Sequence, residues 1–294
     1  MQQLEFLFHR CLRAWGFGAL VLVVGFVIFS ILEGSFFFKR IKKPWRSTRL
    51  DLQYFCLGLL YPPCISFVLS AVFAFLMIER KPATPAISPA AFAGQLPAVL
   101  FACDVLVYIR HRIFHASKPL WLFHSIHHSS EELNWTSAAR FHPAENIIEA
   151  TGVVLVFMTG AFMGGNPRVF LVAGLLIGFY DFMIHSNLRW TFGPLGYVLA
   201  SPVQHRWHHS DDPAAMDKNF AAMFSCIDLI LGTFYLPKNV RPKATGLYKE
   251  QRQSFPRNFS GQLAYPIKGA AVPAKRPAPD VARAIKSRQP AADS

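Results

Sequence analysis

The sequence predicts an all-α protein: a polytopic bundle of membrane helices with a helical cap on its cytoplasmic side, which carries a histidine-rich site for two metal ions. Composition is the first reason, because 52% of the 294 residues are hydrophobic and only 16% are charged, which is too apolar for an ordinary soluble domain. Several apolar runs also have the length of a membrane-spanning helix. The histidines are the third reason, since ten of the eleven lie between residues 111 and 209, in clusters.

The N-terminal region predicts two membrane segments. The first apolar run extends from Trp15 to about Phe38, and no small-residue cleavage site follows it, so we expect a retained anchor. Six basic residues then crowd residues 39–50, and the positive-inside rule places this loop in the cytoplasm and the N-terminus outside. A second segment, from Leu52 to Ile78, is interrupted by Pro62-Pro63 and is predicted to be one kinked span.

The remaining apolar runs surround the histidines. A run from Phe92 to Ile109 is predicted to cross back, so that the first histidines follow it at the cytoplasmic interface. Runs at 150–163 and 169–184 are joined by a segment rich in helix breakers and are predicted to form a hairpin. Because a hairpin returns the chain to the side it left, both histidine regions are expected to face the cytoplasm. We expect a last, interfacial helix from Ile227 to Leu236.

The charge and the cysteines exclude several classes of protein. The net charge of +13 is carried by basic residues beside apolar spans and in the C-terminal tail, which favours anionic lipid over nucleic acid as their partner. The five cysteines are scattered and never spaced as C-x-x-C, so neither a disulfide framework nor a thiolate zinc site is predicted.

Histidine spacing predicts the metal site. Residues three and four apart share one face of a helix, so H-x-x-x-H and H-x-x-H-H each aim several imidazoles at one point. Imidazole is the commonest neutral metal ligand, and one ion accepts at most about six ligands, so two ions are predicted. The predicted ligands are His111, His115, His124, His127, His128, His185, His205, His208 and His209. His142, which precedes Pro143, is a tenth candidate.

Four other polar residues are predicted to support these ligands. Asp181 lies four residues before His185 on the same helix face, where a carboxylate can fix the orientation of the ring. Asp104 lies inside an apolar run, which suggests either a functional residue or a water-facing acid near the end of the span. Arg140 and Glu145 are predicted either to pair across the turn between them or to form a plain surface ion pair.

The three histidine motifs, in this order, resemble those of the fatty acid hydroxylase and sterol desaturase superfamily. The resemblance covers about residues 95–240 and includes Arg140 to Glu145, His185 to Asn187, and Ser201-Pro202 before the last cluster. It implies a membrane enzyme in which histidines hold two iron ions, with zinc possible in purified samples. The metal centre itself is expected to be the catalytic group, with no separate catalytic residue.

The resemblance implies O₂-dependent hydroxylation of a fatty acyl, sterol or related lipid in the membrane, with desaturation of such a lipid as the alternative. Electrons are expected from a separate donor, a ferredoxin or a cytochrome b5-like protein with its reductase. We expect an integral protein of a bacterial inner membrane whose active site lies on the cytoplasmic side. The alternatives from other classes are a membrane metal-ion transporter or binding protein, and a haem-binding membrane protein.

These features divide the chain into three parts. Residues 1–94 are predicted to be membrane-anchoring helices, and residues 95–240 a fatty acid hydroxylase-like catalytic domain. Residues 241–294 are predicted to be a basic extension rich in proline and alanine, partly disordered because the tail beyond Pro266 has almost no large apolar residues.

Overall fold

The described part of the protein is helical. In the computed structural model it comprises residues 23–25, 27–33, 45–58, 87–162, 165–238 and 240–268. These ranges contain no β-strand, only one isolated antiparallel bridge between Ser210 and Thr245. This confirms the predicted all-α class. The longer elements are the helix Val23–Glu33, α2 (Trp45–Gly58), α4 (Pro89–Ala116), α6 (Pro143–Phe162) and α7 (Pro167–His185).

The other helical elements of the described chain are short. They are α5 (Lys118–His124), α8 (Pro202–His208), α9 (Ser225–Ile230), α10 (Lys249–Ser254) and α11 (Phe259–Lys268), together with the single 3-10 turns η1 (His127–Ser129), η2 (Trp135–Ala139), η3 (Gly193–Tyr197) and η4 (Pro213–Ala215).

Proline and polar caps fix where the histidine-bearing helices begin. Ser88, Asn166 and Ser201 precede α4, α7 and α8, and each side chain accepts a hydrogen bond from a backbone N–H of the first turn. Proline stands in the first turn of these same helices, where its missing N–H has no helical partner to lose. The start of each helix is therefore encoded locally, and the histidines fall at the opposite ends.

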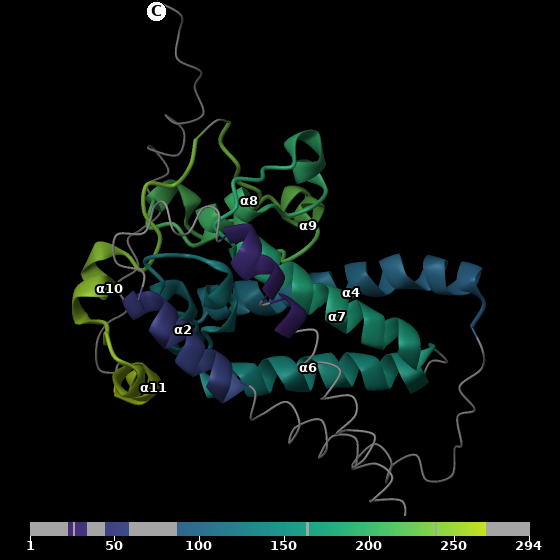
Figure 1. Cartoon of the computed structure of the whole chain (residues 1–294), viewed down its shortest axis with the longest axis horizontal. Coiled ribbons are helices and arrows are strands. Elements are labelled where there is room, and N and C mark those ends of the chain that lie inside the picture. The colour runs from purple at the N-terminus through teal and green to yellow at the C-terminus, as the bar shows by residue number, and fades with distance from the viewer. Residues whose placement is uncertain are drawn as a thin grey trace, which may run out of the picture.

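The long apolar helices lie together and extend away from the histidine-rich body (Figure 1). α4 packs against α7, and α7 also contacts α6. Pro89–Ala116 and Arg168–His185 are long and apolar enough to cross a membrane by length and composition. At 28 residues, α4 outruns the predicted span from Phe92 to Ile109 at both ends, so it carries His111 and His115 on the same continuous helix.

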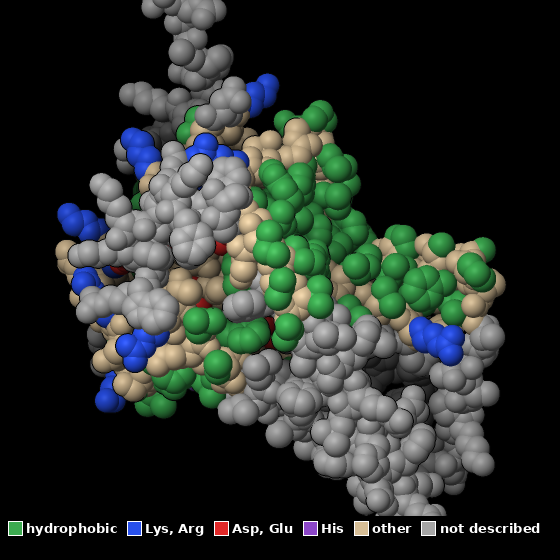
Figure 2. Space-filling view, viewed as in Figure 1, with side chains coloured by type: hydrophobic (Ala, Val, Ile, Leu, Met, Phe, Trp, Pro, Cys, Tyr) green, Lys and Arg blue, Asp and Glu red, His purple; other side chains and the backbone are tan. Residues whose placement is uncertain are grey.

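Large apolar side chains remain exposed on this part of the molecule. On α4, Phe101, Leu106 and Ile109 are 40%, 48% and 47% exposed, and Ile230 of α9 is 76% exposed. Figure 2 shows hydrophobic side chains gathered on the face where the helix Val23–Glu33 and α9 lie, and again along the projecting part of α4. Soluble proteins rarely expose apolar surface on this scale, whereas a membrane protein turns it toward lipid. We therefore describe the chain as a membrane protein.

Both flanks of the histidine-rich region pack onto it. Phe29 of the N-terminal helix contacts Phe179 and Phe182 of α7, with ring centroids 5.1 and 6.4 Å apart. One apolar cluster joins α2 and α5 to the region after residue 240, through Tyr54, Trp121, Leu122, Ile126, Leu247, Phe255 and Tyr265. Residues 241–268 are thus ordered around α10 and α11, and residues beyond 268 lie outside the described chain.

One expected helix differs in extent. The interfacial helix predicted from Ile227 to Leu236 is wrong in its second half, because α9 ends at Ile230. Gly232 takes a left-handed φ of 74°, and the backbone N–H groups of Thr233 and Phe234 both turn back to the carbonyl of Asp228. The predicted spans at 15–38 and 52–78 fall mostly outside the described residues, apart from the N-terminal helix and α2.

Candidate metal centre

Four helices deliver histidines from their C-terminal ends. His115 lies in the last turn of α4, His124 in that of α5, His185 in that of α7 and His208 in that of α8. The C-terminus of a helix carries partial negative charge from its unpaired carbonyl groups. Four such ends directed at one region create an environment that favours cations.

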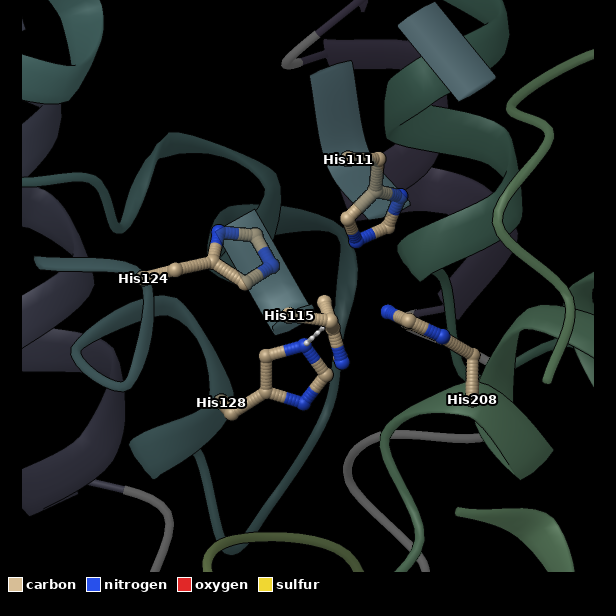
Figure 3. Close-up of side chains that lie close together, drawn as sticks. All are labelled: His111, His115, His124, His128 and His208. Atoms are coloured by element: carbon tan, nitrogen blue, oxygen red, sulfur yellow. Dashed lines mark hydrogen bonds between the residues drawn. The ribbon is translucent and has the colours of Figure 1, made fainter. Parts of the chain in front are cut away.

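The structure gathers the nine predicted histidines into two groups. We call His111, His115, His124, His128 and His208 the first histidine group, and His127, His185, His205 and His209 the second histidine group; within each, the possible ligand atoms all lie within 4.8 Å of one another. Figure 3 shows the five rings of the first histidine group pointing toward a common space from α4, α5, η1 and α8.

The H-x-x-H-H motifs divide between the two groups in a regular way. His124 and His128, four residues apart, belong to the first group, while His127 belongs to the second. In the last motif the assignment is reversed: His205 and His209 belong to the second group and His208 to the first. Neighbouring residues in a helical turn point about 100° apart, so one motif serves two adjacent sites.

The Nε2 atoms of the second histidine group face one another at short distances. His185 Nε2 lies 3.1 Å from His127 Nε2 and 3.0 Å from His205 Nε2. The Nδ1 atom of His185 is 2.8 Å from the carbonyl oxygen of Asp181, to which it must donate, so in a neutral ring Nε2 carries only a lone pair. One lone pair facing two imidazole nitrogens is the arrangement that a cation between them would stabilise.

The first histidine group is oriented in the same way. Four of its rings have an oxygen acceptor at Nδ1: the carbonyl of Phe220 for His111 (2.9 Å), the carboxylate of Glu145 for His124 (2.6 Å), the carbonyl of Lys218 for His208 (2.7 Å) and the carboxylate of Asp217 for His115 (3.2 Å). The Nε2 atoms of His111, His124 and His208 are buried and have no hydrogen-bond partner within the protein. Buried polar atoms are rarely left unpaired, so these three point to a bound ion.

Burial keeps four of these imidazoles in the neutral form that binds metals. Desolvation lowers the pKa of His208 to about 3, and lowers the pKa values of His127, His205 and His209 well below the usual range, with neighbouring histidines adding to the effect. At neutral pH each of these four rings is therefore neutral and has one nitrogen with a free lone pair.

Comparison with known proteins agrees with this geometry. The family model for fatty acid hydroxylases matches residues 96–233, the segment that contains all nine of these histidines. Residues 96–233 belong to the fatty acid hydroxylase family. No solved structure matches the chain.

Two relatives of this fatty acid hydroxylase domain are named for reactions on lipids. An alkylglycerol monooxygenase of Caenorhabditis elegans is 34% identical over 148 residues, which cover 50% of this chain and 28% of that protein. The ornithine lipid hydroxylase OlsE of Rhizobium tropici is 31% identical over 176 residues, which cover 60% of this chain and 51% of that protein. A very-long-chain aldehyde decarbonylase of Oryza sativa subsp. indica is 28% identical over 141 residues, covering 45% of this chain and 22% of that protein. The chain thus spans about half or less of the length of these relatives.

A short segment of the fatty acid hydroxylase domain supplies most of the acceptors that bind the Nδ1 atoms of the first histidine group. The sequence analysis did not predict this role. Asp217, Lys218 and Phe220 together orient His115, His208 and His111. Within this segment the backbone is left-handed at Asp217 (φ 53°) and Asn219 (φ 58°). Aspartate and asparagine tolerate that conformation better than other residues, so their alternation after the last cluster was the available signal.

Asp104 lies against this segment rather than against a ring. Its carboxylate accepts hydrogen bonds from the backbone N–H groups of Ala222, Met223 and Phe224, at 2.9, 3.0 and 2.6 Å. Asp228 binds the N–H groups of Phe220 and Ala221 in the same manner. Asp104 thus ties residues 222–224 to α4, and Asp228 ties residues 220–221 to α9, so the support that Asp104 gives to the histidines is indirect.

The expected pair of Arg140 and Glu145 is wrong. Arg140 is 2% exposed and binds the carboxylate of Asp51 on α2 and the carbonyl of Ser47. Glu145 binds His124 instead. Each side chain is captured by a partner distant in sequence, so Arg140 fastens α2 to η2, and Glu145 is the residue of the two that touches the site.

The tenth candidate, His142, lies outside both groups. Its Nδ1 accepts a hydrogen bond from the N–H of Ala144, 3.0 Å away, in the first turn of α6. Its Nε2 lies 3.2 Å from the carbonyl of Leu263 and donates to it. With both ring nitrogens in use, His142 caps α6 and contacts α11.

Proposed function

We propose that this protein is an O₂-dependent lipid hydroxylase whose first and second histidine groups each hold one iron ion. The observation that supports it best is the presence of two adjacent groups, of five and four histidines, with their ligand atoms buried and convergent. His128 of the first group and His209 of the second stack with centroids 4.4 Å apart, so two ions held there would be neighbours.

The donor set fits iron. Nine neutral nitrogen ligands suit divalent first-row metals, zinc included, so zinc in a purified sample would not contradict the proposal. When bound, an iron pair supplies the activation of O₂ that lipid oxidation needs. The protein orients five of the nine imidazoles through acceptors at Nδ1 and keeps bulk water from the site by burying the rings.

Lipid is the substrate class that the surroundings favour. The exposed apolar surface of α4 leads along one helix to His111 and His115, so a lipid lying against α4 can present a carbon to the site while the rest of its chain stays in the bilayer. The names of the relatives, alkylglycerol monooxygenase and ornithine lipid hydroxylase, support the same class. Desaturation of a lipid is the alternative, because both reactions begin by removing hydrogen from carbon.

Isotope labelling tests the reaction. We expect membranes that contain the active protein to incorporate one oxygen atom from ¹⁸O₂ into a lipid, with none from labelled water, and each turnover to consume two electrons. Mass spectrometry of lipids from cells with and without the protein measures this, because hydroxylation adds one oxygen and desaturation removes two hydrogens. The electrons are proposed to come from a separate ferredoxin or cytochrome b5-like protein with its reductase. Label from water, or turnover without O₂, would return weight to the transporter alternative.

Membrane orientation is a further expected result. We propose that the protein lies in a bacterial inner membrane with the histidines on the cytoplasmic side. In a variant whose five cysteines are replaced by serine, Gln253→Cys on α10 should resist an impermeant thiol reagent added from outside. Ala90→Cys is also exposed but lies at the end of α4 that is remote from His111 and His115, and it should react. The reverse pattern would place the site on the outer side.

A further inference from the structure

Glu33 is a buried carboxylate that reaches the site from outside the fatty acid hydroxylase domain. It is the last residue of the helix Val23–Glu33, lies well before residues 96–233, and is 1% exposed. Its Oε1 accepts hydrogen bonds from the backbone N–H groups of Asn187 (2.6 Å) and Trp135 (3.1 Å). Asn187 follows His185 by two residues, so this contact acts close to a member of the second histidine group.

Arg206 binds the same two segments, but it donates hydrogen bonds to their carbonyl groups, whereas Glu33 accepts from their N–H groups. It directly follows His205, and its Nη2 donates to the carbonyl of Leu133 (2.8 Å) and that of Ser186 (3.4 Å). Burial lowers the pKa of Arg206 to about 10, and Glu33 opposes that shift. The carboxylate satisfies N–H groups and the guanidinium satisfies carbonyls of residues 133–135 and 186–187.

This arrangement connects the two halves of the second histidine group. His185 ends α7, and His205 lies in α8, yet their Nε2 atoms are 3.0 Å apart. The backbone immediately after His185 is held by Glu33 and Arg206 together, and Arg206 is itself the neighbour of His205. A buried backbone group that loses its hydrogen-bond partner is costly, so the two side chains together fix the backbone that follows His185.

We propose that Glu33 is a positioning residue for the second histidine group, and that the N-terminal helix is therefore part of the active site. The inference rests on the proposed function in that the group it positions is taken to hold a metal ion. Loss of Glu33 leaves two backbone N–H groups without their acceptor. The spacing of His185 and His205 then relaxes, while the first histidine group keeps its own supports at Glu145 and residues 217–220.

The test combines metal content with amide hydrogen exchange in the full-length protein. After reconstitution with ferrous iron, we expect two ions per chain in the wild type and one in Glu33→Leu. In the metal-free protein, Glu33→Leu should exchange the amides of Asn187 and Trp135 about tenfold faster or more, because their acceptor is gone. The backbone N–H groups of residues 222–224 donate to Asp104, so their exchange rates should be unchanged and serve as an internal control.

A matched variant separates positioning from general stability. Asp51→Asn removes another buried carboxylate of the N-terminal region, which binds Thr136 and Arg140 rather than the segment after His185. We expect it to lower the melting temperature but to retain two ions. If Glu33→Leu fails to fold, Glu33→Gln carries the test, since glutamine keeps an acceptor but no charge, and should weaken the second ion about tenfold.

Two results would overturn the proposal. One is a Glu33→Leu protein that folds, binds two ions and shows unchanged exchange at residues 135 and 187. The other is a Glu33→Gln protein that binds both ions with wild-type affinity. A wild type that takes up fewer than two ions would contradict the proposed function instead, while the exchange of the metal-free variants would still report on whether Glu33 holds these segments.

Discussion

Replacing His208 with alanine is expected to reduce lipid hydroxylation by more than about 100-fold, the upper end of the loss caused by removing a residue that only supports a ligand. His208 packs against three other rings of the first histidine group, with ring centroids 4.4 Å from His111, 4.8 Å from His115 and 4.7 Å from His128. Its removal deletes one buried ligand atom and leaves the carbonyl of Lys218 without its donor. Elemental analysis should show the metal content falling from two ions per chain to about one, in parallel with the loss of oxidised lipid.

His142→Ala is the matched control for this variant. His142 is also a histidine in the family-matched segment, but both of its nitrogens are occupied by hydrogen bonds outside the two groups. We expect it to retain two ions and most of the activity, and to lose about 1 kcal/mol of stability through the lost cap of α6. A loss of metal in His142→Ala as large as in His208→Ala would mean that the nine-histidine assignment is incomplete.

The second large effect is expected at Glu145. Glu145→Leu should lower the metal affinity of the first histidine group by about 10- to 100-fold, because an acceptor that orients a ligand contributes on that scale. The carboxylate lies 2.6 Å from Nδ1 of His124, and both side chains are buried. Without it, the N–H of His124 is buried and unpaired, and nothing fixes which nitrogen faces the ion. Titration of the metal-free protein against a competing chelator measures the change.

Two variants make the Glu145 result specific. Glu145→Gln keeps an oxygen acceptor for His124 and should recover part of the affinity. Glu149→Leu, one turn later on α6, removes a partly exposed carboxylate that pairs with Arg110 at 2.8 Å, and should leave metal affinity unchanged. If Glu145→Leu binds metal as tightly as the wild type does, His124 is oriented by something other than this carboxylate.

Local sequence accounts for the helices and for the presence of a histidine-rich site. Apolar runs of sufficient length predict the membrane helices, and α4 and α7 have the required length and composition. Proline and polar caps mark the helix starts. The four-residue spacing of His111 and His115 places two imidazoles on one face, and the number of clustered histidines exceeds what one ion accepts. All of these are properties of a few consecutive residues.

The division of the histidines is only partly local. Helical geometry requires His124 and His128 to separate from His127, and His205 and His209 to separate from His208. It does not say which pair joins His111 and His115 and which joins His185. That choice depends on how α8 packs against α7 and how α5 packs against α4, which the spacing within a motif does not determine.

Apart from Asp181, which lies one turn before His185 on the same helix, the supporting residues were decided by tertiary structure. Glu145 and Arg140 are five residues apart and of opposite charge, which locally favours a pair, yet His124 and Asp51 bind them instead. The carbonyl of Phe220 orients His111 from 109 positions away, and Glu33 binds the N–H of Asn187 across 154 positions. Periodicity is set by the backbone of each helix and can be read from its own residues. The partner of a buried polar group is set by which segments the packed helices bring within hydrogen-bonding distance, and no local pattern records that.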